Sequence, residues 1–236
     1  RSDGWLVDSN YDDTLLAEKR HPTRDELDLV SSTRPIAVVH VSGHLMVVNS
    51  AALAELHIEE TTPDPEGGHI VRDLTSADQR RPNGILEETA THHARDKTLD
   101  LSATDAWQMT QLATSEYLQY GVTTASAGGM PTAIASLLGP MSKYNQMPLR
   151  VALFPFFDEV GDGLLTGELA LDNFASGRVS VPRVKIIADG SIQGFTGYLS
   201  KPYHRPHKGD PDYRGYPAVP RDALFEQVEG LYKQRV

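Results

Sequence analysis

VKIIADGS, at residues 184–191, is the stretch that decides the fold. It is a short aliphatic run around one lysine, Lys185, and it closes in an Asp-Gly-Ser turn. A run of this kind between Pro182 and Gly190 is typical of a strand that is buried on both faces, as in parallel sheets covered by helices. Because a buried ammonium group is costly unless it is paired, neutralised or modified, we expect Lys185 to have a chemical role.

The residues alone leave three interpretations of Lys185 open. The strand could lie at a sheet edge, where the lysine stem covers apolar neighbours and the ammonium group reaches solvent. A desolvated lysine on a barrel strand can instead form a Schiff base with a carbonyl substrate. In the third interpretation, carbon dioxide carbamylates the lysine to an anion that bridges two metal ions.

The composition narrows the class of protein. The 236 residues include 22 Lys and Arg against 32 Asp and Glu, a net charge of -10, which argues against a nucleic-acid partner. No segment approaches the roughly 20 apolar residues that cross a bilayer, so we expect no membrane partner and a cytoplasmic location. The absence of cysteine excludes disulfides and thiolate metal sites, and leaves histidine, carboxylate and modified lysine as metal ligands.

Apolar strands alternate with helices along the chain. The expected strands are 36–41, 122–126, 149–156 and 184–188, and the expected helices are 13–19, 23–30, 49–56, 85–94, 102–120, 132–144, 164–174 and 221 onward. This alternation predicts an α/β protein in which the four strands are parallel. Between residues 61 and 84 the composition shifts to Pro, Gly, Asp and Arg, which predicts a hairpin insertion.

Polar side chains follow the predicted strands. His40, His44, Ser126, Lys185 and Asp189 all fall at or beyond strand carboxyl ends, where barrel active sites are built. No glycine-rich loop of the kind that binds dinucleotides or nucleotide triphosphates follows a strand, which argues against the dinucleotide-binding and nucleotide-triphosphate-binding folds. The pattern therefore favours a (β/α) barrel, with His40, Ser126 and Lys185 pointing to one end.

Several motifs in the same order along nearly the whole chain point to one family. They are YDDTL at 11–15, HPTR at 21–24, VSGH at 41–44, VNSAAL at 48–53, TPDP at 62–65, PNGILEE at 82–88, VKIIADGS at 184–191 and TGYL at 196–199. Together they resemble the YtcJ-like branch of the metal-dependent amidohydrolase superfamily, also called amidohydrolase family 3.

This resemblance implies a hydrolase on a partial (β/α)8 TIM barrel of the metal-dependent hydrolase type. It implies a divalent metal cofactor, one or two ions of the zinc type, with Lys185 carbamylated as a metal ligand. Lys185 and Asp189 are the expected catalytic residues, and His40, His44 and Ser126 the expected substrate-binding residues, with the two histidines acting as substrate contacts or as loop organisers. Hydrolysis of an amide or formamide C–N bond by metal-activated water is the implied reaction.

The family's other metal ligands have no counterpart in this sequence. The family supplies a His-x-His pair that would precede Arg1, and further histidines and an aspartate that would follow Val236, so we expect residues 1–236 to be the central part of a longer barrel domain. The expected partner is a small-molecule amide substrate, and a homodimer is the expected assembly. Two alternatives stay open: a Schiff-base lyase of the aldolase type that uses Lys185, and a non-catalytic module.

Overall fold

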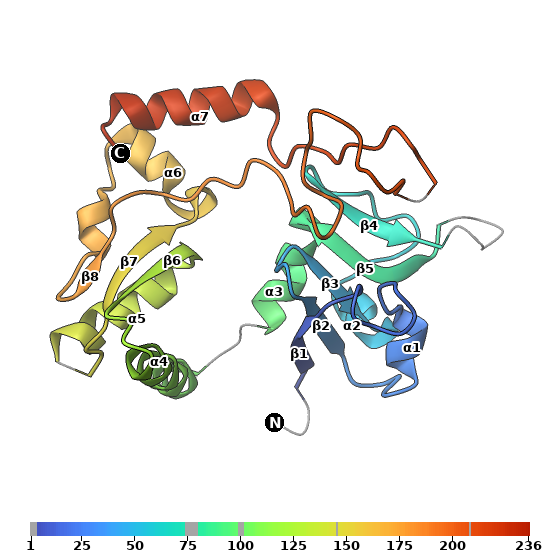
Figure 1. Ribbon diagram of the computed structural model, residues 1–236, viewed down its shortest axis with the longest axis horizontal. Helices are drawn as coiled ribbons and strands as arrows, with labels where there is room; N and C mark the ends of the chain where they lie inside the picture. Colours follow the sequence, from blue (N-terminus) through green and yellow to red (C-terminus); the bar gives the residue numbers. More distant parts are fainter. Residues whose placement is uncertain (1–3, 74–79, 99–101, 145, 208) are drawn as a thin grey trace. The chain divides into compact units, whose positions relative to one another are not determined.

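The chain forms two compact units (Figure 1), and each unit is built from two separate stretches of sequence. The computed structural model describes residues 4–73, 80–98, 102–144, 146–207 and 209–236. Unit 1 comprises Arg1–Asp100 with Ala188–Pro220, and unit 2 comprises Leu101–Ile187 with Arg221–Val236.

Unit 1 contains a five-stranded mixed sheet with the strand order β1-β2-β3-β5-β4. The strands are β1 (Leu6–Tyr11), β2 (Ile36–His40), β3 (Leu45–Val48), β4 (Gly68–Arg72) and β5 (Pro82–Glu88). β1 is parallel to β2, and the other neighbouring strands are antiparallel. β4 and β5 pair antiparallel, and β5 lies inside the sheet between β3 and β4. That residues 61–84 are an insertion stays a prediction.

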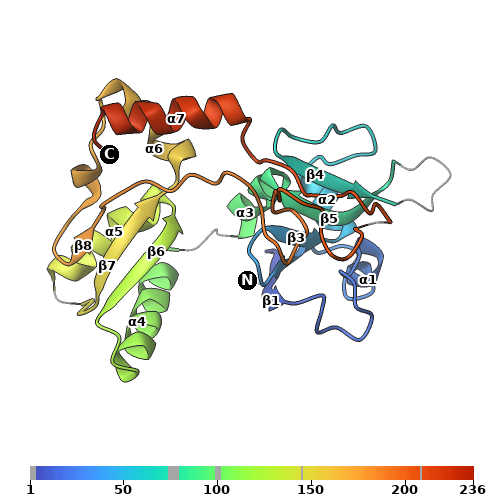
Figure 2. The ribbon, with the colours of Figure 1, turned by 45° about the horizontal axis from the view of Figure 1, so that its top comes forward.

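The sheet of unit 1 is buried on both faces at its centre. Alternate residues of β3 enter two different cores: Met46 and Val48 belong to one, and Leu45 and Val47 to the other. The first core includes residues of the helices α2 (Ser50–Glu55) and α3 (His92–Thr98), and the second is packed against by α1 (Arg24–Asp28). Figure 2 shows these helices around the sheet, and the 3-10 turn η1 (Thr89–Thr91) links β5 to α3.

Two helix starts in unit 1 are fixed by side chains. Thr23 and Glu26 form the predicted capping box at α1, which confirms the helix expected at 23–30 in a shorter form. Asn49, which is fully buried, caps α2 by accepting a hydrogen bond from the Ala52 amide at 3.0 Å. Its Oδ1 also accepts from the Ile36 amide at 3.0 Å. Its amide group donates to the carbonyls of Ser31 (2.7 Å) and Arg34 (2.9 Å), so one side chain ties β2, α2 and the preceding loop together.

Unit 2 contains a sheet of three parallel strands. The strands are β6 (Thr124–Met130), β7 (Arg150–Pro155) and β8 (Val179–Ser180), in the order β6-β7-β8. The helical elements are α4 (Ala103–Gln119), α5 (Thr132–Lys143), α6 (Phe157–Thr166), the 3-10 turn η2 (Leu171–Phe174) and α7 (Arg221–Lys233). Parallel neighbours need crossover connections, and α5 supplies the one between β6 and β7.

The core of unit 2 lies between α5 and the sheet. Leu138 and Met141 of α5 pack with Val151 and Leu153 of β7 in one buried cluster. A second cluster joins α6 to α7 through Val160, Leu164 and Leu231. The predicted helices at 102–120, 132–144 and 221 onward are confirmed. The helix predicted at 164–174 is wrong over most of its length, because α6 ends at Thr166, before the left-handed Gly167, and residues 171–174 form the 3-10 turn η2.

The α/β class is confirmed. The prediction that the strand at 36–41 lies parallel to the strands at 122–126, 149–156 and 184–188 is wrong. β6 and β7 are parallel, and Phe156 and Lys185 form a parallel bridge beyond them. β2 instead lies in the mixed sheet of unit 1, where β3 runs antiparallel to it. Gly43, with φ 73°, permits the tight turn that reverses the chain after β2 and lets Leu45–Val48 pair back onto it.

The helix predicted at 13–19 is wrong, and the helix predicted at 85–94 is wrong in its first part, since η1 and α3 begin only after β5 ends. Residues 13–19 form turns, in which the Asp12 carboxylate accepts from the amide of Thr14 at 2.8 Å. Residues 85–88 continue β5, because Ile85 and Leu86 pair with β3 and are buried by it.

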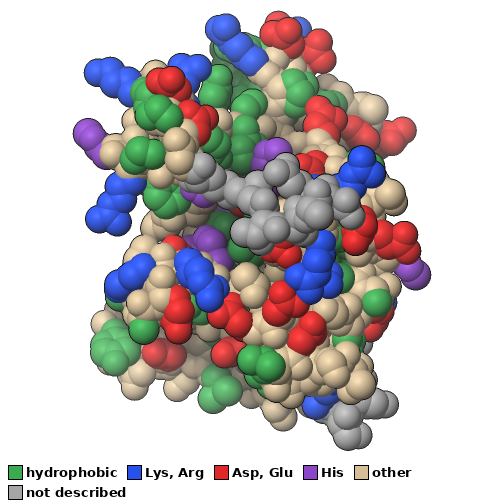
Figure 3. Space-filling view, turned by 90° about the vertical axis from the view of Figure 1, so that its right-hand side faces the viewer, with side chains coloured by type: hydrophobic (Ala, Val, Ile, Leu, Met, Phe, Trp, Pro, Cys, Tyr) green, Lys and Arg blue, Asp and Glu red, His purple; other side chains and the backbone are tan. Residues whose placement is uncertain are grey.

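The surface of unit 1 carries charges of both signs. On the face shown in Figure 3, acidic and basic side chains alternate without a basic stripe. Of the helices that the structure describes, none is long and apolar enough to span a bilayer.

We predict that Asn49→Ala destabilises the protein strongly. The change removes the α2 cap and leaves buried backbone groups at Ile36, Ser31 and Arg34 without their partner, at a cost of about 2–4 kcal/mol. Urea unfolding of the full-length protein measures this loss. Asn83→Ala is the matched control, because the Asn83 side chain makes one turn hydrogen bond, to the Ile85 amide, and should cost about 1 kcal/mol or less. Equal losses in the two variants would contradict this role of Asn49.

Candidate active site

Glu88 of unit 1 is a buried glutamate with a strained backbone. It ends β5 with backbone angles φ 52° and ψ −121°, a region that non-glycine residues adopt at a cost of order 1–3 kcal/mol. Its side chain is buried, with the residue 6% exposed. Its amide donates to the carbonyl of His44 at 2.9 Å, which joins the end of β5 to the β2–β3 turn. A strained, buried carboxylate of this kind is typical of functional sites.

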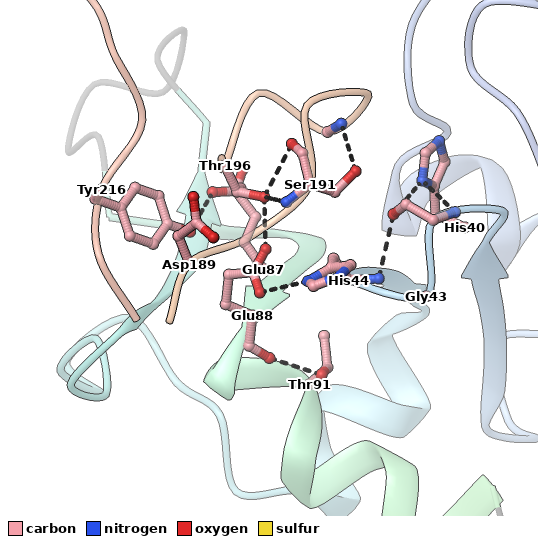
Figure 4. A network of polar contacts seen from close by, with 12 residues as sticks. His40, Gly43, His44, Glu87, Glu88, Thr91, Asp189, Ser191, Thr196 and Tyr216 are labelled. Carbon is pink, nitrogen blue, oxygen red and sulfur yellow. Dashed lines mark hydrogen bonds and ion pairs between the residues drawn. The ribbon is translucent and has the colours of Figure 1, made fainter. Parts of the chain in front are cut away.

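The Glu88 carboxylate joins two segments that are distant in sequence (Figure 4). His44 Nδ1 lies 2.7 Å from one carboxylate oxygen, and the Thr196 hydroxyl donates to the other at 2.5 Å. This contact through Nδ1 orients the His44 ring against the end of β5. Burial lowers the pKa of the nearby Arg95 guanidinium, and the charge of Glu88 acts in the opposite direction. Glu88 therefore brings a histidine, a hydroxyl and a cationic side chain to one place.

The loop that carries Thr196 is held by its own backbone. The Thr196 hydroxyl accepts from the Ser191 amide at 2.9 Å, and the amides of Thr196 and Gly197 donate to the Ser191 carbonyl. Asp189 accepts from the Tyr198 amide at 2.8 Å, so its carboxylate bonds the amides of its own loop, one of the two roles that a turn aspartate can take.

A second buried glutamate, Glu87, faces a group of aromatic side chains. The Tyr216 hydroxyl donates to Glu87 at 3.3 Å, and the Tyr216 ring meets the His69 ring edge to face at 4.5 Å. Burial first, and then the charge of Glu87, raise the pKa of Tyr213 to about 12. His69, Glu87 and Tyr213 line a cavity of about 640 Å³ in unit 1.

The five predicted site residues lie in both units. His40 and His44 belong to unit 1 with Asp189, and Ser126 and Lys185 belong to unit 2. The His44 side chain is 29% exposed, whereas that of His40 is fully buried, with Asp13 on one ring nitrogen and Ser42 on the other. The substrate-binding roles of His40 and His44 stay predictions.

The two residues in unit 2 do not lie as the sequence suggests. Ser126 is exposed within β6, which continues to Met130, so it does not mark the carboxyl end of its strand. Lys185 forms a single bridge in place of a strand: its amide donates to Pro155 and its carbonyl accepts from Phe157. The expectation of a strand buried on both faces is wrong, because Lys185 forms one bridge and its side chain is exposed.

Sequence reasoning missed Glu88, Thr196 and the partners of His40. Glu88 was expected to open a helix, and its position at a strand end depends on pairing with β3. In the part of the chain that the structure describes, one group of three His, Asp or Glu side chains could share a metal ion: Asp13, His21 and His40. The motifs at 11–15 and 21–24 contain Asp13 and His21 and were the available signal.

We predict that Gly190→Ala disrupts the contact between Glu88 and Thr196. An added Cβ at Gly190 would fall far inside van der Waals distance of both side chains, and such overpacking costs about 1–3 kcal/mol. Thermal unfolding of the full-length variant measures the loss. Gly128→Ala is the control, since a Cβ there would meet no atom within 4 Å. A Gly190→Ala protein as stable as the control variant would show that the loop can shift freely.

Comparison with known proteins places the whole chain in one family. The model of the Amidohydrolase family matches residues 1–236. The chain is 26% identical over 224 residues to the putative amidohydrolase YtcJ of Bacillus subtilis (strain 168), covering 89% of this chain and 38% of that protein. It is 30% identical over 148 residues to the N-substituted formamide deformylase of Arthrobacter pascens, covering 61% of this chain and 27% of that protein. The chain thus spans well under half the length of these relatives.

A solved structure agrees with the fold. The crystal structure of an uncharacterized metal-dependent hydrolase from Pyrococcus horikoshii OT3 superposes with a TM-score of 0.60 at 23% identity, over 98% of this chain and 43% of that one. The resemblance found in the sequence motifs is confirmed by the family match along the full chain. The chain belongs to the amidohydrolase family.

Proposed function

We propose that this chain is part of a hydrolase that cleaves C–N bonds of amide or formamide substrates. The observation that carries the proposal is the match of the amidohydrolase family to all 236 residues. The relative from Arthrobacter pascens, which is named an N-substituted formamide deformylase, supports the choice of bond. The chain spans 38% of the Bacillus subtilis relative and 27% of the Arthrobacter pascens relative. The substrate therefore belongs to the proposal for the whole protein.

The fold part of the proposal concerns unit 2. Its strands β6, β7 and β8 are parallel, and the bridge at Lys185 extends the same parallel order. Consecutive parallel strands with crossover helices are the repeating unit of a (β/α)8 barrel. We infer that unit 2 contributes this part of a metal-dependent hydrolase barrel, with Lys185 beside the residue that follows β7.

The residues near Lys185 do not complete a metal site by themselves. A catalytic zinc needs about three protein ligands, and the group of three close ligands among the described residues does not contain Lys185. We propose that Lys185, when carbamylated, supplies one ligand to one or two divalent ions in the whole protein. When bound, such an ion activates water and polarises the carbonyl of the substrate.

The Schiff-base alternative receives no support from the geometry. A lysine nucleophile needs a desolvated amine, and Lys185 is exposed. Borohydride trapping of a substrate adduct on Lys185 would favour that lyase, whereas loss of turnover on chelation favours the hydrolase.

The first functional prediction concerns Lys185. In the full-length protein, Lys185→Ala should remove most bound metal and nearly all amide or formamide hydrolysis, because the carbamate anion and the cations stabilise one another. Short carboxylic acids should restore part of both by occupying the vacated space. Lys143→Ala, at an exposed lysine that ends α5 in the same unit, is the control and should keep both. Unchanged metal content and turnover in Lys185→Ala would show that the lysine is structural.

The second functional prediction concerns His44, whose Nδ1 is held by Glu88 and whose side chain is partly exposed. If His44 binds substrate, His44→Ala should raise KM about 10- to 100-fold, the loss expected for one hydrogen bond to a charged group. His69→Ala is the control, because His69 forms a comparable pair with Asp64 at 2.9 Å and is half exposed. Steady-state kinetics that give both variants the same KM as the unaltered protein would remove His44 from the substrate site.

A further inference from the structure

Three metal-ligating side chains from separate parts of unit 1 meet beside β2. Asp13 lies in the turn that follows β1, His21 precedes α1, and His40 is the last residue of β2. One ligand atom of each lies within 4.8 Å of the other two. The His40 side chain is fully buried and that of Asp13 is 15% exposed, so the group is enclosed. We refer to these three residues as the Asp13–His21–His40 cluster.

The spacing of the cluster suits a tetrahedral ion. Zinc lies about 2.0–2.1 Å from nitrogen and oxygen ligands, which separates two ligands of one tetrahedron by about 3.3 Å. His40 Nε2 and Asp13 Oδ1 are 3.1 Å apart, close to that edge, so a shift of His21 toward them would complete three corners. Two imidazoles and one carboxylate suit zinc and similar transition ions, whereas calcium and magnesium prefer oxygen ligands alone.

The surroundings hold the two rings in place. His40 Nδ1 accepts a hydrogen bond from the Ser42 amide at 3.2 Å and lies 2.8 Å from the Ser42 hydroxyl, so the turn after β2 fixes the orientation of this ring. The Tyr11 hydroxyl lies 3.0 Å from His21 Nδ1, and the Tyr11 ring packs edge to face on both imidazoles. Partners that orient ligating histidines are a regular part of metal sites.

A solvent path reaches the carboxylate. A cavity of about 780 Å³ in unit 1 is lined by Asp13 and Thr14 on one side and by Gln193 and Phe195 on the other. An ion could enter there without opening the sheet. Lys19 and Arg205 also line the cavity, and their positive charges oppose cation entry, so the histidine ligands must provide the affinity.

We propose that the Asp13–His21–His40 cluster binds one zinc-type divalent ion, with water as the fourth ligand. The ion joins the turn after β1 and the segment before α1 to the end of β2. This role is structural: it fixes the β2–β3 turn that carries His44. The inference does not depend on the proposed hydrolysis, and its test does not use activity.

The experiment measures zinc directly in the full-length protein. Zinc per chain is determined by elemental analysis after dialysis against a zinc buffer, and melting temperature is measured with zinc and with EDTA. Asp13→Asn keeps the size of the side chain and its hydrogen bond to His40, and His21→Asn removes a ligand that is not fully buried, so both variants should fold. Each should bind one zinc fewer per chain than the unaltered protein, or bind it at least about 10- to 100-fold more weakly, and lose the zinc-dependent rise in melting temperature.

Two further variants sharpen the result. Tyr11→Phe removes an orienting hydroxyl but no ligand, and should weaken zinc binding about tenfold. Asp64→Asn alters another histidine–aspartate pair of unit 1, Asp64 with His69. Among the described residues this pair has no third metal-ligating side chain close by, so the change should leave zinc binding unchanged. The proposal is overturned if Asp13→Asn and His21→Asn bind as much zinc as Asp64→Asn. It is also overturned if they lower the melting temperature equally in zinc and in EDTA, because the cluster would then be a hydrogen-bonded group only.

Discussion

The buried carboxylate of Glu88 is the interaction on which unit 1 depends. It accepts hydrogen bonds from His44, in the β2–β3 turn, and from Thr196, in a loop more than a hundred positions further along the chain. A buried acceptor without its donors would cost about 1–3 kcal/mol or more, so the strained backbone at Glu88 is tolerable only when both segments are in place. The sheet and the late loop therefore stabilise each other through one side chain.

Local signals predicted the elements that depend on local structure. The capping box at Thr23 and the helix over Thr132–Lys143 follow from residues a few positions apart, and both are present. The strands β1 and β3 were missed, because their assignment depends on pairing with β2 and not on their own short sequences. The same limit explains Ile85–Glu88, whose helix-like pattern is overridden by pairing with β3.

In the candidate site, too, the sequence predicted the residue types but not the contacts between distant segments. The motifs identified the family and contain His44, Lys185 and Asp189, and His40 was singled out by its place at the end of a predicted strand, yet neither signal could say which side chains touch. Tertiary packing between segments that are distant in sequence brings His44 to Glu88. It also brings Asp13 and His21 to His40. Burial of Lys185 was inferred from its aliphatic neighbours, but burial requires a layer of side chains packed over the strand's face, and a short apolar run does not reveal whether that layer is present.

The interrupted layout of unit 1 has a consequence for biosynthesis. Ribosomes deliver the chain from the N-terminus at roughly 5–20 residues per second, so several seconds separate Arg1–Asp100 from Ala188–Pro220 while Leu101–Ile187 emerges. During that interval the first sheet is complete in its strands, but Glu88 has no Thr196 and the face over Leu45 lacks the loop that later covers it near Gly194. Unit 2 meanwhile receives all three of its strands in one uninterrupted run. Until the loop that carries Thr196 emerges, the nascent first sheet therefore leaves the Glu88 carboxylate without one of its donors and the face at Leu45 uncovered.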